Sequence, residues 1–156
     1  MFRAMRRHAQ QLERSECDRI LLQQPRGVLS VLGDEGYPYG MPLNYVYDGK
    51  SLLFHCAREG HKLDALDACD KASFCVLDDG VQNEGEWWLC FKSVIAFGRV
   101  SRVVDEEEIR HTLHLLADKY FPQDYDTEGD IARNLSRVVI LRLSIEHLSG
   151  KAVREK

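Results

Sequence analysis

The sequence lacks the patterns that mark several common classes of protein. It has no apolar run long enough to span a bilayer and no apolar segment typical of a secretory signal near its start. Its five cysteines are an odd number without close pairs, which gives neither a disulfide framework nor a zinc motif. No G-x-G-x-x-G or G-x-S-x-G motif occurs. A Rossmann nucleotide site and a serine-hydrolase elbow therefore have no support.

An excess of positive charge is also absent. The formal net charge is -4 at pH 7, so we expect no non-specific attraction to nucleic acid or to anionic lipid. Residues 1–14 are locally basic, with four arginines against Glu13. This arm is expected to pack on a partner or an anionic ligand, or else to be a frayed tail. Reduced cysteines and the absence of a signal or membrane segment favour the cytoplasm.

What the chain does contain fits one soluble domain over residues 1–156. Hydrophobic residues make up 44% and charged residues 29%, which is ordinary for a globular protein of this length. Most segments alternate or run apolar over four to eight residues between turn signals, as strands do. The expected strands are residues 26–33, 41–47, 51–57, 71–78, 87–104 and 137–148.

Helix patterns are fewer. One helix is expected from a Ser15 cap to Pro25, a short one over residues 63–69, a longer one after an Asp105 cap, and a short segment near residues 131–136. Strands joined by tight turns favour antiparallel pairing, and about six of them bury one face by closing into a barrel. The predicted fold is mainly β with peripheral helices, an antiparallel β-barrel.

The stretch "FHCAREGHKLDAL", residues 54–66, carries the most chemistry. His55 and Cys56 are neighbours on a strand, so they point to opposite faces and do not form a base–nucleophile pair. Metal binding is a minor hypothesis, because no second close pair of ligands completes a site with His55, Cys56 and His61. His111 and His114 lie three residues apart on the expected helix, but on its polar side, where solvent-exposed histidines are the simpler interpretation. An anion-binding turn fits better: the chain leaves a strand, passes Arg58, Gly60, His61 and Lys62, and enters a helix. A solvated basic turn would give the same pattern.

Longer motifs resemble a known family. The segment "RGVLSVLGDEGYPYGMPLNYVYDGKSLLFHCAREGHKLDAL", the later "KSVIAFGRV" and the "SGK" near the C-terminus are similar to the pyridoxamine 5'-phosphate oxidase-related flavoproteins. The similarity is greatest to the branch with the 5-nitroimidazole-resistance proteins. The resemblance implies a split β-barrel that forms a homodimer and binds FMN between its two subunits.

The resemblance also implies roles for single residues. Lys62 and His61 would hold the FMN phosphate, helped by Ser93, while the "PLNY" strand would lie along the flavin ring. His55 would face the substrate, position it or donate a proton, and Lys151 offers a further flexible cation. The implied cofactor-binding residues are Leu43, Asn44, Tyr45, Cys56, Ala57, Gly60, His61, Lys62 and Ser93.

Three functions stay open on this basis. The first is a reductase or oxidase that uses FMN on a small, flat, electron-poor substrate, with NAD(P)H as a donor. The second is a non-catalytic flavin-binding or redox-sensing protein. The third is haem binding with His55 or His61 as the axial ligand. Pyridoxamine 5'-phosphate oxidation itself is less expected, because the chain ends in "AVREK" without an arginine-rich signature.

Overall fold

The computed structural model describes residues 1–153, and Arg154, Glu155 and Lys156 lie outside the described residues. The strands are β1 (Arg26–Leu32), β2 (Pro38–Asn44), β3 (Val46–Tyr47), β4 (Ser51–Ala57), β5 (Lys71–Leu77), β6 (Phe91–Arg102) and β7 (Val138–Val153). The α-helices are α1 (Arg14–Gln23), α2 (His61–Ala68), α3 (Glu106–Tyr120) and α4 (Thr127–Asn134). Short 3-10 turns occupy His8–Gln10, Asp34–Gly36 and Leu135–Arg137.

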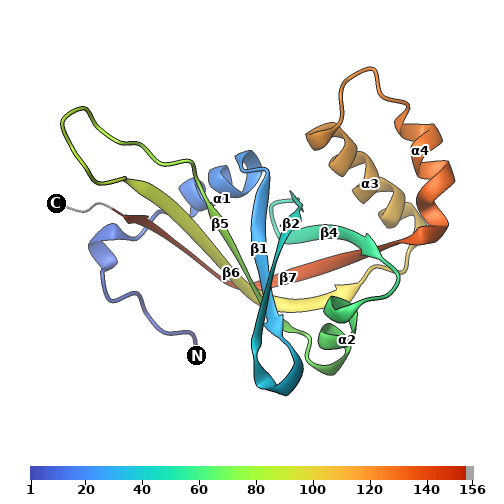
Figure 1. Ribbon diagram of the computed structural model, residues 1–156, viewed down its shortest axis with the longest axis horizontal. Coiled ribbons are helices and arrows are strands. Elements are labelled where there is room, and N and C mark those ends of the chain that lie inside the picture. The colour runs from blue at the N-terminus through green and yellow to red at the C-terminus, as the bar shows by residue number, and fades with distance from the viewer. Residues whose placement is uncertain (154–156) are drawn as a thin grey trace.

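One antiparallel sheet holds all seven strands, in the order β2-β1-β5-β6-β7-β4-β3 (Figure 1). Strands β2 and β3 lie at opposite edges of this order, yet only Tyr45 separates them in the chain. The sheet must therefore curl until its two edges meet. Within residues 1–153 no ladder joins β2 to β3, so the barrel stays split at this seam. The predicted antiparallel split barrel with peripheral helices is confirmed.

The inside of the barrel is the main core. Side chains from all the long strands meet there, and α1 covers one opening with Cys17, Ile20 and Leu21. A second, smaller cluster forms outside the barrel, where Leu53 and Ile140 pack under Leu116 of α3. Strand β4 is therefore buried on both faces over most of its length, and it links the core to the helical side of the molecule.

The seam at Tyr45 is closed by the end of α3 instead of by a strand. The Tyr45 amide donates to the Tyr120 hydroxyl (2.9 Å), and that hydroxyl donates to Tyr45 O (2.8 Å) or Pro25 O (2.5 Å). The Lys119 ammonium donates to Tyr45 O (3.1 Å) and Gln24 O (2.9 Å). These side chains supply the bonds that a ladder would have made, because buried backbone groups need partners.

Replacing Tyr120 with phenylalanine is expected to destabilise the fold by about 1–3 kcal/mol, because the Tyr45 amide loses its acceptor in a partly buried seam. Urea unfolding followed by circular dichroism measures the change. Tyr125→Phe is the control, since its hydroxyl makes one exposed bond to Asp130. If the two substitutions lowered the free energy of unfolding equally, the hydrogen bonds of Tyr120 at the seam would contribute no more to stability than one exposed bond.

Lys119 should make stability depend on pH. Burial lowers the pKa of this ammonium to about 8, from an ordinary 10.5. Between these values the unfolded chain binds more protons, so the contribution of Lys119 to the free energy of unfolding rises with pH. The Tyr45 ring, 4.1 Å from the ammonium, and the two carbonyls offset part of the cost of burying the charge.

We therefore expect the wild type to gain about 1 kcal/mol relative to Lys119→Met between about pH 7.5 and 9.5. The difference between the two proteins is the quantity to measure, because the buried thiols and tyrosines also titrate at high pH. Chemical denaturation at matched pH values gives it. A constant difference over this window would mean that Lys119 titrates as an exposed lysine.

Several expected elements differ in the structure. Helix α1 starts at Arg14, and Glu13 occupies its N-cap without a side-chain bond, so the Ser15 cap was wrong. The single strand expected over residues 41–47 is broken at Tyr45. Trp87 and Trp88 precede β6 in a loop, where their rings make an edge contact at 5.7 Å. The strand expected over residues 87–104 therefore begins only at Phe91.

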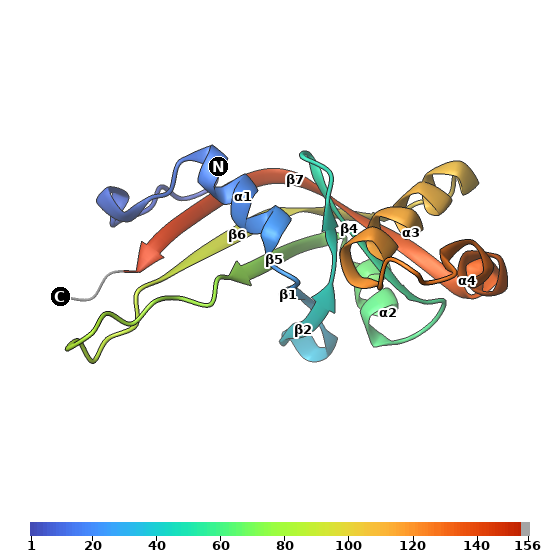
Figure 2. The ribbon, with the colours of Figure 1, turned by 90° about the horizontal axis from the view of Figure 1, so that it is seen from above.

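The last strand is longer than the sequence indicated. Strand β7 has 16 residues and runs through the "SGK" motif to Val153, so Lys151 sits in a ladder opposite Ser93 and is not on a flexible tail. The basic arm packs along this part of β7: Leu12 N donates to Gly150 O (2.9 Å), and the Phe2 ring stacks on His147 at 4.6 Å. The views in Figures 1 and 2 place the arm at the opposite end of β7 from α3 and α4.

None of the helices within residues 1–153 has the length and apolar character needed to cross a bilayer.

Candidate functional site

Strand β4 separates the core from the candidate site by its alternation. Leu52, Phe54 and Cys56 point into the barrel core. Leu53 and His55 point to the other side, toward α3 and α4. Burial raises the pKa of the Cys56 thiol, so this cysteine is an inert core residue. His55 and Cys56 therefore point to opposite faces of β4, as the strand alternation predicted.

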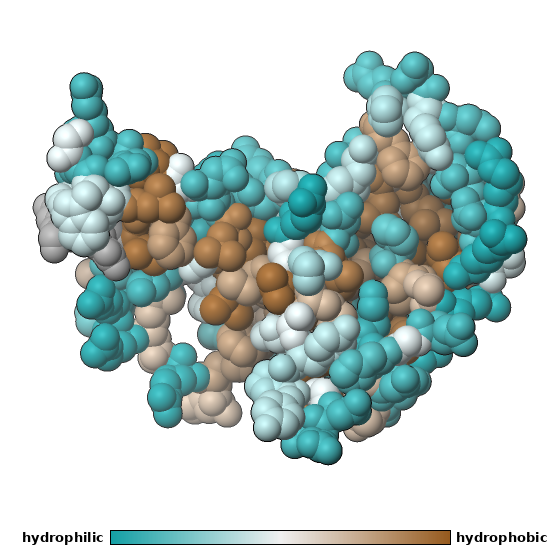
Figure 3. Space-filling model, in the orientation of Figure 1, coloured by the Kyte–Doolittle hydropathy of each residue, from teal (hydrophilic) through white to brown (hydrophobic). Residues whose placement is uncertain are grey.

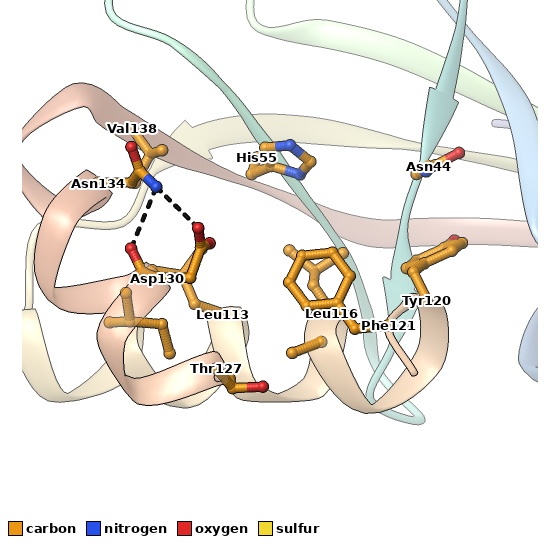
Figure 4. Close-up of a pocket in the computed structure, with 12 residues that line it drawn as sticks. Asn44, His55, Leu113, Leu116, Tyr120, Phe121, Thr127, Asp130, Asn134 and Val138 are labelled. Atoms are coloured by element: carbon orange, nitrogen blue, oxygen red, sulfur yellow. Dashed lines mark hydrogen bonds between the residues drawn. The ribbon is translucent and has the colours of Figure 1, made fainter. Parts of the chain in front are cut away.

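His55 and Asn44 line one wall of a cavity of about 230 Å³ that α3 and α4 close from the other side. Figure 3 shows the apolar recess near these helices, and Figure 4 shows the two strand residues facing the helical ones. The lining is apolar apart from a few polar groups. The helical part of the lining and the residues that follow it are Leu113, Leu116, Ala117, Tyr120, Phe121, Thr127, Asp130, Ile131, Asn134 and Val138.

The His55 imidazole is held in its neutral form. Burial among the surrounding protein atoms lowers its pKa, and the positive charge of Lys62 lowers it further. His55 is nonetheless an exposed residue, so its ring is open to solvent as well as to the cavity that it lines. A neutral imidazole both donates and accepts a hydrogen bond, which suits positioning a ligand better than supplying a proton at neutral pH.

The basic turn after β4 leads directly into α2. Gly60 precedes the helix with a φ of +131°, which side-chain-bearing residues rarely adopt, and a Cβ there would meet nothing within 4 Å. His61 is committed to neighbours: its ring stacks on Tyr39 at 4.3 Å, and its Nε2 lies 3.4 Å from an Asp34 carboxylate oxygen. Lys62 forms no ion pair with any residue of 1–153.

Comparison with known proteins gives the family. The sequence profile described as pyridoxamine 5'-phosphate oxidase matches residues 13–152. The chain belongs to the pyridoxamine 5'-phosphate oxidase family. None of the curated proteins with which the sequence was compared matches it. The resemblance on which the sequence interpretation relied is confirmed.

Several solved structures have the same fold as this chain. One is a proposed 5-nitroimidazole antibiotic resistance protein from Bacteroides thetaiotaomicron, at TM-score 0.76 and 21% identity, covering 91% of this chain and 86% of that one. A FAD-binding protein from Mesorhizobium loti has TM-score 0.69 and 24% identity, with 92% and 97% covered. A FAD- and haem-binding protein from Mycobacterium smegmatis has TM-score 0.75 and 20% identity, with 94% and 74% covered.

The structure of this pyridoxamine 5'-phosphate oxidase family protein brings some predicted site residues together and leaves others apart. His55 and Asn44 share the cavity wall. Lys62 is close enough to His55 for its charge to influence that ring. Ser93 pairs with Lys151 near the far end of β7, whereas His55 pairs with Ile140 near its start.

The remaining predicted residues have mixed surroundings. The Tyr45 side chain is fully buried and its hydroxyl donates to Leu21 O (2.8 Å), so it belongs to the core. Leu43 packs against the core while partly exposed, and Ala57 is exposed at the end of β4. The Tyr45 backbone is occupied as well, because its amide and carbonyl bond to Tyr120 and Lys119.

The sequence predicted a helix at α3 and a short helical segment near residues 131–136, but not that these helices form a cavity wall opposite β4. Asp130 and Asn134 of α4 lie in a region expected to be loop and a short helix near residues 131–136. The signal that could have found α4 is Asp126, whose carboxylate caps the helix by accepting from Gly129 N (2.9 Å).

The histidine pair on α3 has a structural partner. His114 lies 3.2 Å from Glu128 of α4, and His111 is exposed on the same helix. Across residues 1–153, no group of three or more His, Cys, Asp or Glu side chains is arranged to hold a metal ion.

Proposed function

We propose that this protein binds FMN and uses it to reduce or oxidise a small, flat, electron-poor substrate. The observation that carries the proposal is the juxtaposition at the end of β4. A lysine without an ion pair stands beside an open glycine turn and a helix start, and a neutral histidine next to it faces an apolar cavity. A cationic end and an apolar, hydrogen-bonding middle are what a flavin mononucleotide site requires.

The residues present fit the phosphate end of FMN. Lys62 supplies a positive charge that no carboxylate of residues 1–153 neutralises. The space over Gly60 is open, so an anion can approach the backbone at the start of α2. His61 is held by Asp34 and Tyr39, which makes it a flank of this site and leaves Lys62 as the main cation.

The protein's own part in the reaction is binding and orientation. Bound FMN would supply the electron transfer. His55 would position the substrate through its neutral ring, and Asn44 would offer amide hydrogen bonds from the same wall. The apolar side chains of α3 and α4 would keep water away from the substrate.

Assembly as a homodimer is part of the proposal. Large apolar side chains stay exposed along β1, β5 and the loop before β6, and a second copy would cover them. Within one chain, Ser93 and Lys151 lie far along β7 from the end of β4 that precedes Lys62. A second copy would bring its own Ser93 and Lys151 toward the Lys62 of the first. These exposed side chains are Val28, Leu32, Leu77, Val81, Trp87 and Leu89.

The test of the proposed function is a visible spectrum of the purified protein, with and without added FMN, followed by titration with NADH or NADPH. Flavin bands that bleach with a nicotinamide donor and return with a nitro or quinone acceptor support catalysis. Flavin bands that no donor or acceptor changes support a non-catalytic flavin-binding protein. Protein that neither retains nor takes up FMN contradicts the proposal, and light scattering that finds a monomer contradicts the dimer.

Haem binding is the second candidate. The Mycobacterium smegmatis neighbour is described as a FAD- and haem-binding protein, and His55 here presents a neutral imidazole of the kind that ligates iron. A Soret band after reconstitution with haemin, lost in His55→Ala, would favour this function over flavin chemistry.

Substitution of His55 by glutamine is expected to lower turnover of an electron-poor acceptor at least about tenfold, because a positioned hydrogen-bonding ring is lost. FMN affinity should change little, since His55 faces the cavity and Lys62 remains. Steady-state kinetics and flavin titration measure the two quantities. His111→Gln, on the exposed side of α3, is the control. Unchanged kcat and KM in His55→Gln would remove His55 from the site.

A further inference from the structure

We infer that the cavity between β4 and the α3–α4 pair selects planar aromatic ligands that carry a cationic or strongly hydrogen-bond-donating nitrogen group, and that Asp130 recognises this group. The inference rests on the proposed function, since it names the substrate class of the same site.

The cavity has a distinct polarity along its length. Figure 4 shows Asp130 and Asn134 at one end and Asn44 and Tyr120 at the other, with His55 between them. Apolar side chains of α3 and α4 make up most of the surface between the two ends. A flat, apolar ring with different polar groups on its two sides matches this arrangement.

The size of the cavity limits the ligand further. Its volume is about 230 Å³, below the range of roughly 300–1,000 Å³ typical for drug-sized molecules. A single aromatic ring with short substituents is therefore the expected occupant.

Asp130 is held in place by neighbours that use only one of its carboxylate oxygens. Its Oδ1 accepts from Asn134 Nδ2 (3.0 Å) and from the Tyr125 hydroxyl (3.2 Å). The second oxygen has no hydrogen-bond partner within residues 1–153. The side chain is 30% exposed, so the carboxylate is partly withdrawn from water and open to a ligand.

The charges around Asp130 do not cancel it. The nearest cation, Arg133, lies 3.9 Å from Oδ1, is 62% exposed, and also lies 3.7 Å from Asp126. His55 and Tyr120, the other titratable side chains of the lining, add no charge at neutral pH, because burial lowers the pKa of His55 and raises that of Tyr120. The cavity therefore presents a net negative end within apolar walls, and such an end favours a cationic donor over a neutral one.

Three probes of the same shape test the inference: benzamidine, which is cationic, benzamide, which is neutral, and benzoate, which is anionic. Flavin-free protein is titrated with each, and binding is followed by amide and methyl chemical shifts. We expect benzamidine to bind at least about tenfold more tightly than benzamide, and benzoate most weakly. Shift changes should centre on Leu113, Leu116 and Ile131.

Asp130→Asn should remove the preference for benzamidine over benzamide while keeping the shape of the side chain. Glu128→Gln is the matched control, because it removes one negative charge from the same helix, at a residue outside the cavity lining. If Asp130→Asn does not fold, the affinities of the wild-type protein for the three probes still test the inference.

Each of these results overturns the inference: equal affinities for the three probes, binding of none of them, shift changes away from α3 and α4, or an unchanged preference in Asp130→Asn. A preference that both substitutions reduce equally also overturns it, since general surface charge would then explain it. Failure of the proposed function shows separately, as the absence of flavin binding.

Discussion

Replacement of Lys62 by alanine is expected to weaken FMN binding by about 10- to 100-fold, because a charge-assisted contact to a phosphate is worth roughly 1.5–3 kcal/mol. Lys62 stands at the start of α2, where Gly60 leaves the backbone open and where no acid of residues 1–153 pairs with the ammonium. Titration of the apoprotein with FMN, followed by flavin fluorescence, gives the dissociation constants.

Two controls separate phosphate recognition from general damage. Lys50→Ala removes the same charge from the exposed turn before β4 and should leave FMN binding unchanged. Riboflavin has the ring of FMN without its phosphate, so its affinity should be similar in the wild type and in Lys62→Ala. An equal loss for both ligands would mean that Lys62 supports the fold or the ring site and does not grip the phosphate.

Much of this site could be predicted from the alternation of a single strand. The pattern of "SLLFHCA" places His55 and Leu53 on one face and Cys56 on the other, and the structure has this arrangement. A period of two residues is a property of any strand, so the prediction needed no tertiary information. The cap of α3 by Asp105 was equally local and is confirmed by a bond from Glu108 N (2.9 Å).

The features that sequence could not give depend on contacts between distant segments. The "MPLNYVY" segment is rich in strand-forming residues, yet it breaks at Tyr45 because Tyr120 and Lys119, about 75 residues away, bond to its backbone. The "SGK" motif holds a glycine and small polar residues, which usually end a strand. It stays extended here because β6 pairs with it up to Val153.

The cavity itself could not be predicted for the same reason. Asp130 shares a cavity with His55 and Asn44 only when α4 folds back over the strands. The sequence predicted a short helical segment near residues 131–136 but not the first turn of α4, so Asp130 was expected in a loop. Pattern reasoning found the strand wall of the cavity, whereas its helical wall follows from packing. The negative charge of Asp130, which favours one class of ligand, could therefore not be assigned to the cavity from the sequence.

Gly98→Ala is expected to destabilise the protein by about 3 kcal/mol or more, the largest stability effect that we predict. The register between β6 and β7 shifts at Phe97 and Gly98, as it does at a β-bulge. A Cβ on Gly98 would lie 2.0 Å from the Ser144 carbonyl oxygen, and backbone on a paired strand cannot move aside as a flexible side chain can.

Gly40→Ala is the matched control for this effect. Gly40 also lies in a strand, β2, but its nearest neighbours would be side-chain atoms of Val28 and Ser30 at 3.4 and 3.6 Å. Alanine there should be neutral or stabilise slightly, because it restricts the unfolded chain. Urea unfolding of both variants measures the difference. If Gly98→Ala is as stable as Gly40→Ala, the β7 backbone can move away from the added methyl group at Ser144. The bulge would then not determine the direction of the β6 and β7 segments that hold Ser93 and Lys151.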